Sequence, residues 1–254
     1  MIPVRLASTF YEKVWGVPVT EGPQTGLKLG EIWFQEGTLL LKFLFTSERL
    51  SVQVHPDNAY AGEHEQARGG RGKTEMWYVT DTQPGARLAL GFLPGVLQQS
   101  SREQLRQAAL DGSIEQQLHW MEVKPGDAIF VPAGTVHALG PGLTLVEIQQ
   151  CCDITYRLFD YGRPRDLHIE QALDVIAEHP RAGLVPLPFS CEYFRVQLVQ
   201  PDRPESIVPP GLLVVIRGLG SLEGQPVQPR EVWRLSEPAA LMAQQPMQCL
   251  LVNP

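Results

Sequence analysis

The stretch GDAIFVPAGTVH, residues 126–137, decides the fold. It opens with turn chemistry, because Pro125 presets its own φ and the glycine after it can adopt a positive φ. Four apolar residues, 128–131, follow and predict a short strand. Residues 132–134, Pro-Ala-Gly, then turn the chain before His137. The stretch therefore predicts a histidine presented by a strand and a tight loop.

The spacing of this stretch is Gly, five residues, Pro, one residue, Gly, two residues, His. This pattern resembles the second metal-binding motif of the cupin family. A cupin is a small β-barrel that holds a metal in its mouth. The resemblance therefore implies a jelly-roll barrel and further metal ligands elsewhere in the chain.

Many short strands are indicated by the 22 prolines and 23 glycines, which lie between short apolar segments of this 254-residue chain. Such dense turn residues are typical of barrels and sandwiches, so we expect a mainly β fold. The predicted strands cover residues 31–34, 38–46, 50–54, 75–81, 120–123, 128–131, 143–149 and 154–159.

A short helical insertion is predicted at about residues 98–119. Ser101 and Gln104 have the spacing of a capping box, and Ser113 and Gln116 repeat it. Residues 61–73 are polar and glycine-rich and predict a mobile surface loop, whereas residues 167–177 have helical periodicity.

Three parts follow from this reading of the chain. Residues 1–165 form a metal-binding cupin domain that contains the insertion, and residues 166–184 form a helix and linker. Residues 185–254 return to short strands and predict a second, smaller cupin-like β-domain. This last part contains no histidine, so we expect no metal ligands in it.

Composition excludes several classes of partner. The net charge is −7 and no basic tract is present, which argues against nucleic acid. No apolar run is long enough to cross a bilayer, and the N-terminus lacks signal-peptide features, so we expect a cytoplasmic protein. Four cysteines fit no disulfide framework, which predicts reduced thiols. The oligomeric state is left open between monomer and homodimer.

Candidate metal ligands lie at the ends of predicted strands. Gln53 and His55 alternate along one strand and therefore face the same side of a sheet. Glu75 begins the next strand, and His137 ends the opening stretch. Two imidazoles with a carboxylate suit zinc first. Each residue alone would also fit a structural role, so the residues by themselves leave both readings open.

Four blocks then match, in order, the type I mannose-6-phosphate isomerases: LSVQVHPDNAY (50–60), GKTEMWYV (72–79), the opening stretch and LVEIQQCCDITYRLFDYGRP (145–164). The chain resembles this family over most of residues 10–175. The resemblance implies one zinc ion per chain and interconversion of mannose 6-phosphate and fructose 6-phosphate. The reaction would proceed by proton transfer through a cis-enediol(ate).

The resemblance also implies roles for particular residues. The metal ligands would be Gln53, His55, Glu75 and His137. Catalytic residues would be Arg157, Lys73 and Glu147, and the substrate would be bound by Ser51 and Arg163.

Glu147 is the candidate general base, with a metal-bound hydroxide and Lys73 as alternatives. Apolar neighbours on its strand predict a partly desolvated carboxylate with a raised pKa. A structural carboxylate paired with Arg157 is the competing interpretation. Two alternatives to the implied function also stay open: an isomerase of another sugar phosphate, and a metal-binding sugar-phosphate sensor without turnover.

Overall fold

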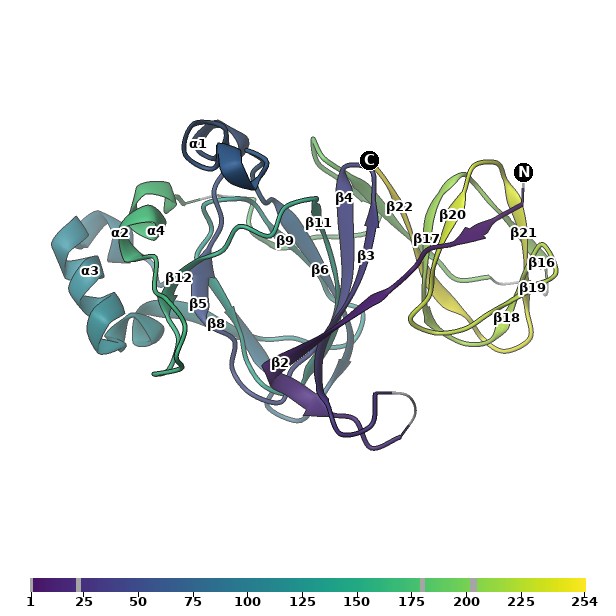
Figure 1. Ribbon diagram of the computed structural model, residues 1–254, viewed down its shortest axis with the longest axis horizontal. Helices are drawn as coiled ribbons and strands as arrows, with labels where there is room; N and C mark the ends of the chain where they lie inside the picture. The colour runs from purple at the N-terminus through teal and green to yellow at the C-terminus, as the bar shows by residue number, and fades with distance from the viewer. Residues whose placement is uncertain (1, 22–23, 179–180, 202–204) are drawn as a thin grey trace. The chain divides into compact units, whose positions relative to one another are not determined.

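The computed structural model describes residues 2–21, 24–178, 181–201 and 205–254, and confirms the predicted mainly β fold (Figure 1). The chain divides into two compact units. The larger unit contains residues 10–33 and 39–185, and the smaller contains residues 1–9, 34–38 and 186–254. The three parts predicted from the sequence, 1–165, 166–184 and 185–254, stay a prediction. Residues 179–180 of the predicted linker lie outside the described residues.

Two sheets build the larger unit. The seven-stranded sheet has the order β13 (Gly183–Leu184), β9 (Ala128–Val131), β6 (Glu75–Thr82), β11 (Leu143–Gln150), β4 (Leu39–Phe45), β3 (Lys28–Glu36) and β2 (Thr9–Pro18). The five-stranded sheet has the order β12 (Tyr156–Phe159), β5 (Val52–Val54), β10 (His137–Leu139), β7 (Arg87–Phe92) and β8 (Leu118–Glu122).

An apolar core joins the inner faces of these two sheets. It includes Leu44, Trp77 and Leu145 from the larger sheet, and Leu88 and Leu139 from the smaller one. Strand side chains alternate between faces, so polar residues on the same inner faces are carried into the interior beside this core. The inward-facing positions of the strands in both sheets are therefore buried, the polar ones included.

The described part of the larger unit has four short helices, α1 (Asn58–His64), α2 (Val96–Gln99), α3 (Arg102–Asp111) and α4 (Ile169–Val175), with 3-10 turns at Gln66–Arg68 and Ser113–Gln117. Of these, α3 and α4 pack against β12, and α4 also contacts β5 of the five-stranded sheet. A second core lies beneath them and contains Val52, Val54, Ala109 and Ala172. Figure 1 shows α2, α3 and α4 grouped beside β12. No helix in the described ranges is long and apolar enough to span a membrane.

The predicted helical insertion is confirmed, although its two capping boxes differ. The Ser101 hydroxyl accepts from the Gln104 amide at 3.2 Å, and the Gln104 side chain accepts from the Ser101 amide at 2.7 Å. The second predicted box is wrong, because Ser113 lies inside a 3-10 turn whose N-cap is Gly112. The Asp111 carboxylate accepts from the Ser113 amide instead, at 2.9 Å.

The predicted loop at 61–73 is wrong at its start. Helix α1 extends to His64, and Asp57 caps it by accepting from the Tyr60 amide at 2.8 Å. Ala61 is fully buried and anchors the helix in the second core. A local cap and one buried methyl group therefore order a segment that composition alone marks as mobile. The helix predicted at 167–177 is confirmed as α4.

The smaller unit confirms the predicted second β-domain. Its six-stranded sheet has the order β1 (Val4–Arg5), β20 (Val232–Leu235), β17 (Gly211–Arg217), β22 (Gln248–Asn253), β15 (Arg195–Val199) and β14 (Phe189–Ser190). Its four-stranded sheet has the order β16 (Glu205–Val208), β21 (Ala239–Ala243), β18 (Gly220–Leu222) and β19 (Gln225–Val227). The core between its strands is apolar and includes Leu213, Trp233 and Cys249.

Candidate metal and substrate site

Strand alternation directs the candidate ligands into the larger unit. Val52 and Val54 of β5 pack outward beneath the helices, so Gln53 and the residue after the strand, His55, face inward. His137 of β10 is the Cα partner of Gln53 across the neighbouring strand. Glu75 opens β6 in the facing sheet. Three strands from two sheets thus converge on one point.

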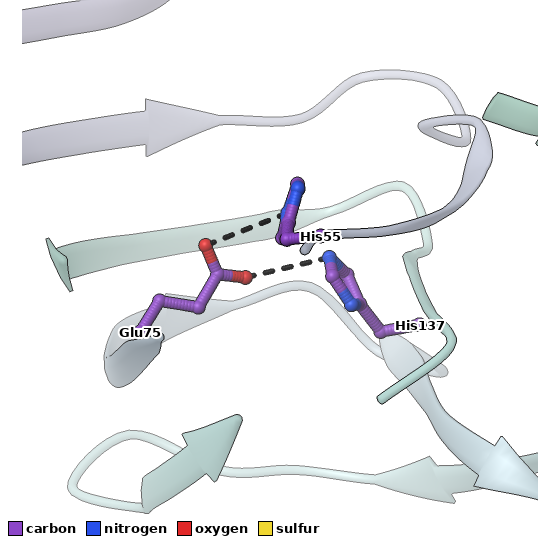
Figure 2. A group of neighbouring side chains, drawn as sticks. All are labelled: His55, Glu75 and His137. Atoms are coloured by element: carbon purple, nitrogen blue, oxygen red, sulfur yellow. Dashed lines mark ion pairs between the residues drawn. The ribbon is translucent and has the colours of Figure 1, made fainter. Parts of the chain in front are cut away.

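His55, Glu75 and His137 form a compact group in which one ligand atom from each residue lies within 4.8 Å of the others. His137 Nε2 lies 3.3 Å from Glu75 Oε1, and His55 Nε2 lies 3.7 Å from Glu75 Oε2. Figure 2 shows the carboxylate pointing at both imidazoles. All three side chains are at most 2% exposed, so solvent does not satisfy them.

Both imidazoles have their tautomers set by backbone carbonyls. His55 Nδ1 lies 2.8 Å from the Ile154 oxygen, and His137 Nδ1 lies 2.9 Å from the Thr135 oxygen. A carbonyl can only accept, so each Nδ1 carries the hydrogen and each Nε2 offers a lone pair. Burial lowers the pKa of both rings, which keeps them neutral near pH 7. Neutral imidazoles with an unprotonated Nε2 are the form that binds metals.

Three buried polar atoms of this group make no hydrogen bond to the described residues, and one of them, Glu75 Oε2, lies 2.7 Å from the Lys73 ammonium. Glu75 Oε1 and His137 Nε2 have no hydrogen bond from any residue that the structure describes. Burial of unpaired polar atoms costs about 2–7 kcal/mol each. A cation between the carboxylate oxygen and the imidazole nitrogen would satisfy both, so these residues fit a zinc ion.

Beside the group lies a buried network of ammonium and carboxylate groups. Lys73 Nζ lies 2.7 Å from Glu75 Oε2 and 3.7 Å from Glu147 Oε1. Lys42 Nζ lies 2.8 Å from the same Glu147 oxygen, and Trp77 Nε1 donates to the other at 3.2 Å. Glu147 on β11 is the Cα partner of Lys42 on β4 and of Trp77 on β6. The register of three adjacent strands therefore builds this row.

The charges in this row reverse one expectation from the sequence. Burial acts to raise the pKa of Glu147, but the ammonium groups of Lys42 and Lys73 outweigh it and hold that pKa below its usual range. The raised pKa predicted for Glu147 is therefore wrong. Glu75 shows the opposite balance, because its burial and the Glu147 carboxylate raise its pKa. The two lysines keep Glu147 ionised.

A cavity of about 250 Å³ adjoins the metal-ligand group. Five residues predicted from the sequence line it: Ser51, Gln53, Lys73, Glu147 and Arg157. Lys42, Arg68 and Arg165 also line it, and sequence reasoning missed them. The structure places Arg163 differently: its guanidinium pairs with Asp160 at 3.3 Å and Glu48 at 3.1 Å, and it is not among the lining residues.

Lys42 left a signal in the sequence, since it is the one charged residue in the apolar segment TLLLKFLFT, 38–46. The whole of β4 is buried, so a lysine there requires a buried partner. Arg68 left no comparable signal, because it lies in the polar segment predicted as a loop. The sequence alone therefore does not show that Lys42 and Arg68 reach the same cavity.

The guanidinium groups give the cavity a basic side. Arg157 is half-buried, and its Nε has no hydrogen-bond partner in the described chain. Burial, followed by the charge of Arg165, lowers the Arg157 pKa, and Arg68 adds to this effect. Arg165 pairs with Asp160 at 2.6 Å, and Arg68 pairs loosely with Asp153 at 3.6 Å. Like charges gathered around an unpaired donor form an arrangement suited to an anion.

Comparisons with known proteins are consistent with this geometry. The chain is 45% identical over 154 residues to the mannose-6-phosphate isomerase of Streptococcus mutans, covering 58% of this chain and 46% of that protein. It is 34% identical over 219 residues to YvyI of Bacillus subtilis, whose name assigns it provisionally to the mannose-6-phosphate isomerases; this match covers 68% of this chain and 67% of that protein. The chain spans about half the length of the first curated relatives it matches.

A solved structure supports the likeness over the whole chain. The crystal structure of the mannose 6-phosphate isomerase from Bacillus subtilis superposes with a TM-score of 0.84 at 25% identity, covering 100% of both chains. No family model matches the chain.

Proposed function

Since the chain belongs to the mannose-6-phosphate isomerase family, we propose that it is a zinc-dependent aldose–ketose isomerase that interconverts mannose 6-phosphate and fructose 6-phosphate. The observation that carries this proposal is the buried His–Glu–His group beside a charged cavity in one unit. A cluster of metal-ligating side chains alone would fit many functions. The cavity adds the ionised carboxylate of Glu147, three ammonium groups and several guanidinium groups, and a sugar-phosphate isomerase needs groups of these kinds.

The zinc ligands in this proposal are His55, Glu75 and His137, with Gln53 as the fourth. Two nitrogens and carboxylate oxygen suit zinc and leave positions open for substrate. Bound zinc would supply Lewis-acid polarisation of the carbonyl and hydroxyl oxygens of the sugar. The position of Gln53 supports its inclusion, because it lines the cavity and is paired in register with His137. One such site per chain is proposed.

The proton chemistry is assigned to Glu147. The aldose loses the proton on C2 to a base, giving a cis-enediol(ate). Return of a proton to C1, with transfer of the hydroxyl proton from O2 to O1, yields the ketose; the reverse reaction starts at C1. Glu147 lines the cavity and is ionised at neutral pH, so it is available to take this proton, while the lysines that lower its pKa also weaken it as a base. The ammonium groups of Lys42 and Lys73 lie beside it and would stabilise the enediolate oxygen.

Lys73 is a poorer candidate for the base. Burial acts to lower its pKa, but the carboxylates of Glu147 and Glu75 outweigh burial and raise it. A lysine held charged cannot accept a proton at neutral pH. We therefore assign Lys73 the role of an electrostatic donor.

The substrate phosphate is assigned to the basic side of the cavity. Arg157 offers an unpaired Nε, and a guanidinium can hold phosphate oxygens bidentately. Arg68 and Arg165 line the same cavity, as does Ser51. Asp160 pairs with both Arg163 and Arg165, but Arg165 lines the cavity and Arg163 is not among the lining residues, so we favour Arg165 for contact with the phosphate.

The test is a coupled assay of the purified protein on mannose 6-phosphate, as isolated, after chelation, and after zinc is added back. We expect activity that disappears with the chelator and returns with zinc. Zinc bound without turnover of mannose 6-phosphate would overturn the substrate assignment. A panel of other sugar phosphates, scored by exchange of the C2 proton with solvent, then separates another isomerase from a sensor, since a sensor exchanges no proton.

A further inference from the structure

The lone pair of His55 Nε2 is already engaged by a neighbour. Its Nδ1 carries the hydrogen that faces the Ile154 carbonyl, so Nε2 is an acceptor with a single lone pair. Lys73 Nζ lies 3.0 Å from that Nε2. An ammonium has hydrogens and no lone pair, so it is the donor in this contact. A lone pair that accepts from Lys73 cannot bind a metal at the same time.

The same ammonium also occupies the carboxylate of the site. Lys73 Nζ lies 2.7 Å from Glu75 Oε2, on the side that faces His55. On the other side, Glu75 Oε1 and His137 Nε2 lie 3.3 Å apart and lack any hydrogen-bond partner among the described residues. Lys73 thus satisfies one half of the candidate ligand group and leaves the other half open.

From this geometry we infer that Lys73 is an internal cation that competes with the metal for His55 and Glu75. In the metal-free protein it compensates the buried carboxylate and imidazole. Metal binding displaces it, and a second carboxylate lies within reach: Glu147 Oε1, 3.7 Å from Nζ, which already pairs with Lys42 and can accept from both lysines. The displaced ammonium therefore moves toward the proposed base. The inference rests on the ligand set given under the proposed function.

Two consequences distinguish competition from a purely structural role. A competitor weakens metal binding and stabilises the metal-free form, so its removal affects the two forms in opposite directions. A merely structural lysine stabilises both forms alike. Metal affinity and the Tm of each form therefore separate the two cases without reference to turnover.

The experiment compares zinc binding by wild type, Lys73→Met and Lys42→Met at one pH, using calorimetric competition with a chelator of known affinity. Methionine keeps much of the volume of lysine and removes its charge. Lys42→Met is the matched control, because Lys42 belongs to the same network and contacts Glu147. We expect Lys73→Met to bind zinc about tenfold tighter than wild type, since a hydrogen bond to a charged group is worth roughly that factor. Lys42→Met should change zinc affinity less.

The second measurement is the difference in Tm between the zinc-loaded and chelated forms. We expect this difference to be larger in Lys73→Met than in wild type. If Lys73→Met does not fold, Lys73→Gln replaces it, since glutamine remains polar and uncharged. Wild-type or weaker zinc affinity in the folded variant would overturn the inference. Failure of wild type itself to bind zinc would instead overturn the proposed ligand set.

Discussion

The two units share a similar strand architecture but differ in the side chains that fill their interiors. Each consists of antiparallel strand pairs arranged in two sheets around an apolar core. In the larger unit the interior also holds charged side chains, among them Lys42, Lys73, Glu75 and Glu147, which are at most 5% exposed. Among the described residues of the smaller unit, no polar or charged side chain is buried.

The difference shows that the fold does not need the buried charges. Desolvation of an ion pair can cost more than its attraction returns, so an apolar interior is the more stable choice. The smaller unit has such an apolar interior throughout its described residues. Charges retained in the larger unit therefore point to chemistry rather than to stability, and substitutions in the two units should differ in kind.

The largest effect is expected at the metal-ligand group. His137→Ala should abolish zinc retention and lower kcat/KM by roughly a thousandfold or more, because a Lewis acid supplies several kcal/mol of transition-state stabilisation. Metal analysis of the purified variant and steady-state kinetics measure both effects. His119→Ala, at an exposed position of β8, is the control and should retain zinc and activity. Full zinc occupancy in His137→Ala would show that the ligand set is wrong.

Next in size is the loss of the proposed base. Glu147→Gln should retain zinc and lower kcat by about 100-fold or more, as is typical when a general base is removed. The amide keeps the shape of the side chain but cannot accept the proton. Single-turnover measurements on mannose 6-phosphate, with zinc content as the control, check this outcome. An unchanged kcat would leave Glu147 as a structural partner of the lysines.

Stability gives the most direct contrast between the two interiors. Lys42→Met leaves Glu147 without its nearest cation and should lower the free energy of unfolding by about 3 kcal/mol. Leu213→Met, in the core of the smaller unit, should cost less than about 1.5 kcal/mol, because volume is nearly conserved. Urea denaturation measures both. Equal losses of stability in Lys42→Met and Leu213→Met would mean that leaving Glu147 without Lys42 costs no more than an ordinary core substitution.

At the edge of the cavity a smaller effect is expected. Arg68→Ala should raise KM for mannose 6-phosphate roughly tenfold, with kcat little changed, since one charged contact to phosphate is lost. Arg71→Ala is the matched control, because Arg71 is exposed in the same segment and is not among the cavity-lining residues. The same rise in KM for both variants would assign the effect to general charge.

The smallest effect concerns the sealed interior of the smaller unit. Burial raises the pKa of Cys249 to about 12, so its thiol stays protonated at pH 8. We expect a thiol reagent at that pH to modify half-buried Cys151 and to leave fully buried Cys249 intact until urea is added. Mass spectrometry of peptides locates the label. Labelling of Cys249 in the folded protein would show that this unit opens more easily than its packing indicates.

Local patterns predicted much of the fold. The turn and strand at 126–131, the Ser101–Gln104 capping box and helix α4 all depend on residues close in sequence. Positions at strand ends supplied the candidate ligands, and the resemblance implied the same set; strand alternation explains why Gln53 and His55 face the same side. The structure then brings His55, Glu75 and His137 together.

What could not be predicted depends on pairing between distant strands. Lys42 and Glu147 are separated by 105 positions, and only the register of β4 against β11 brings them within 2.8 Å. The pKa of Glu147 follows from that register, so apolar neighbours along its own strand predicted the wrong direction. The helix α1 was missed because its cap, Asp57, precedes the segment whose composition suggested a loop.

Side chains along β11 point alternately to the two faces of the sheet, and Glu147 meets Lys42 and Trp77 because it occupies a position that faces the cavity. One residue inserted between Leu145 and Val146 would turn the carboxylate to the opposite face and bring Val146 into the cavity. Two inserted residues would restore the face but move the carboxylate along the sheet by about 7 Å. A change of length in the loops that flank β11 leaves this alternation intact, whereas a single-residue insertion just before Val146 would remove the carboxylate from the cavity.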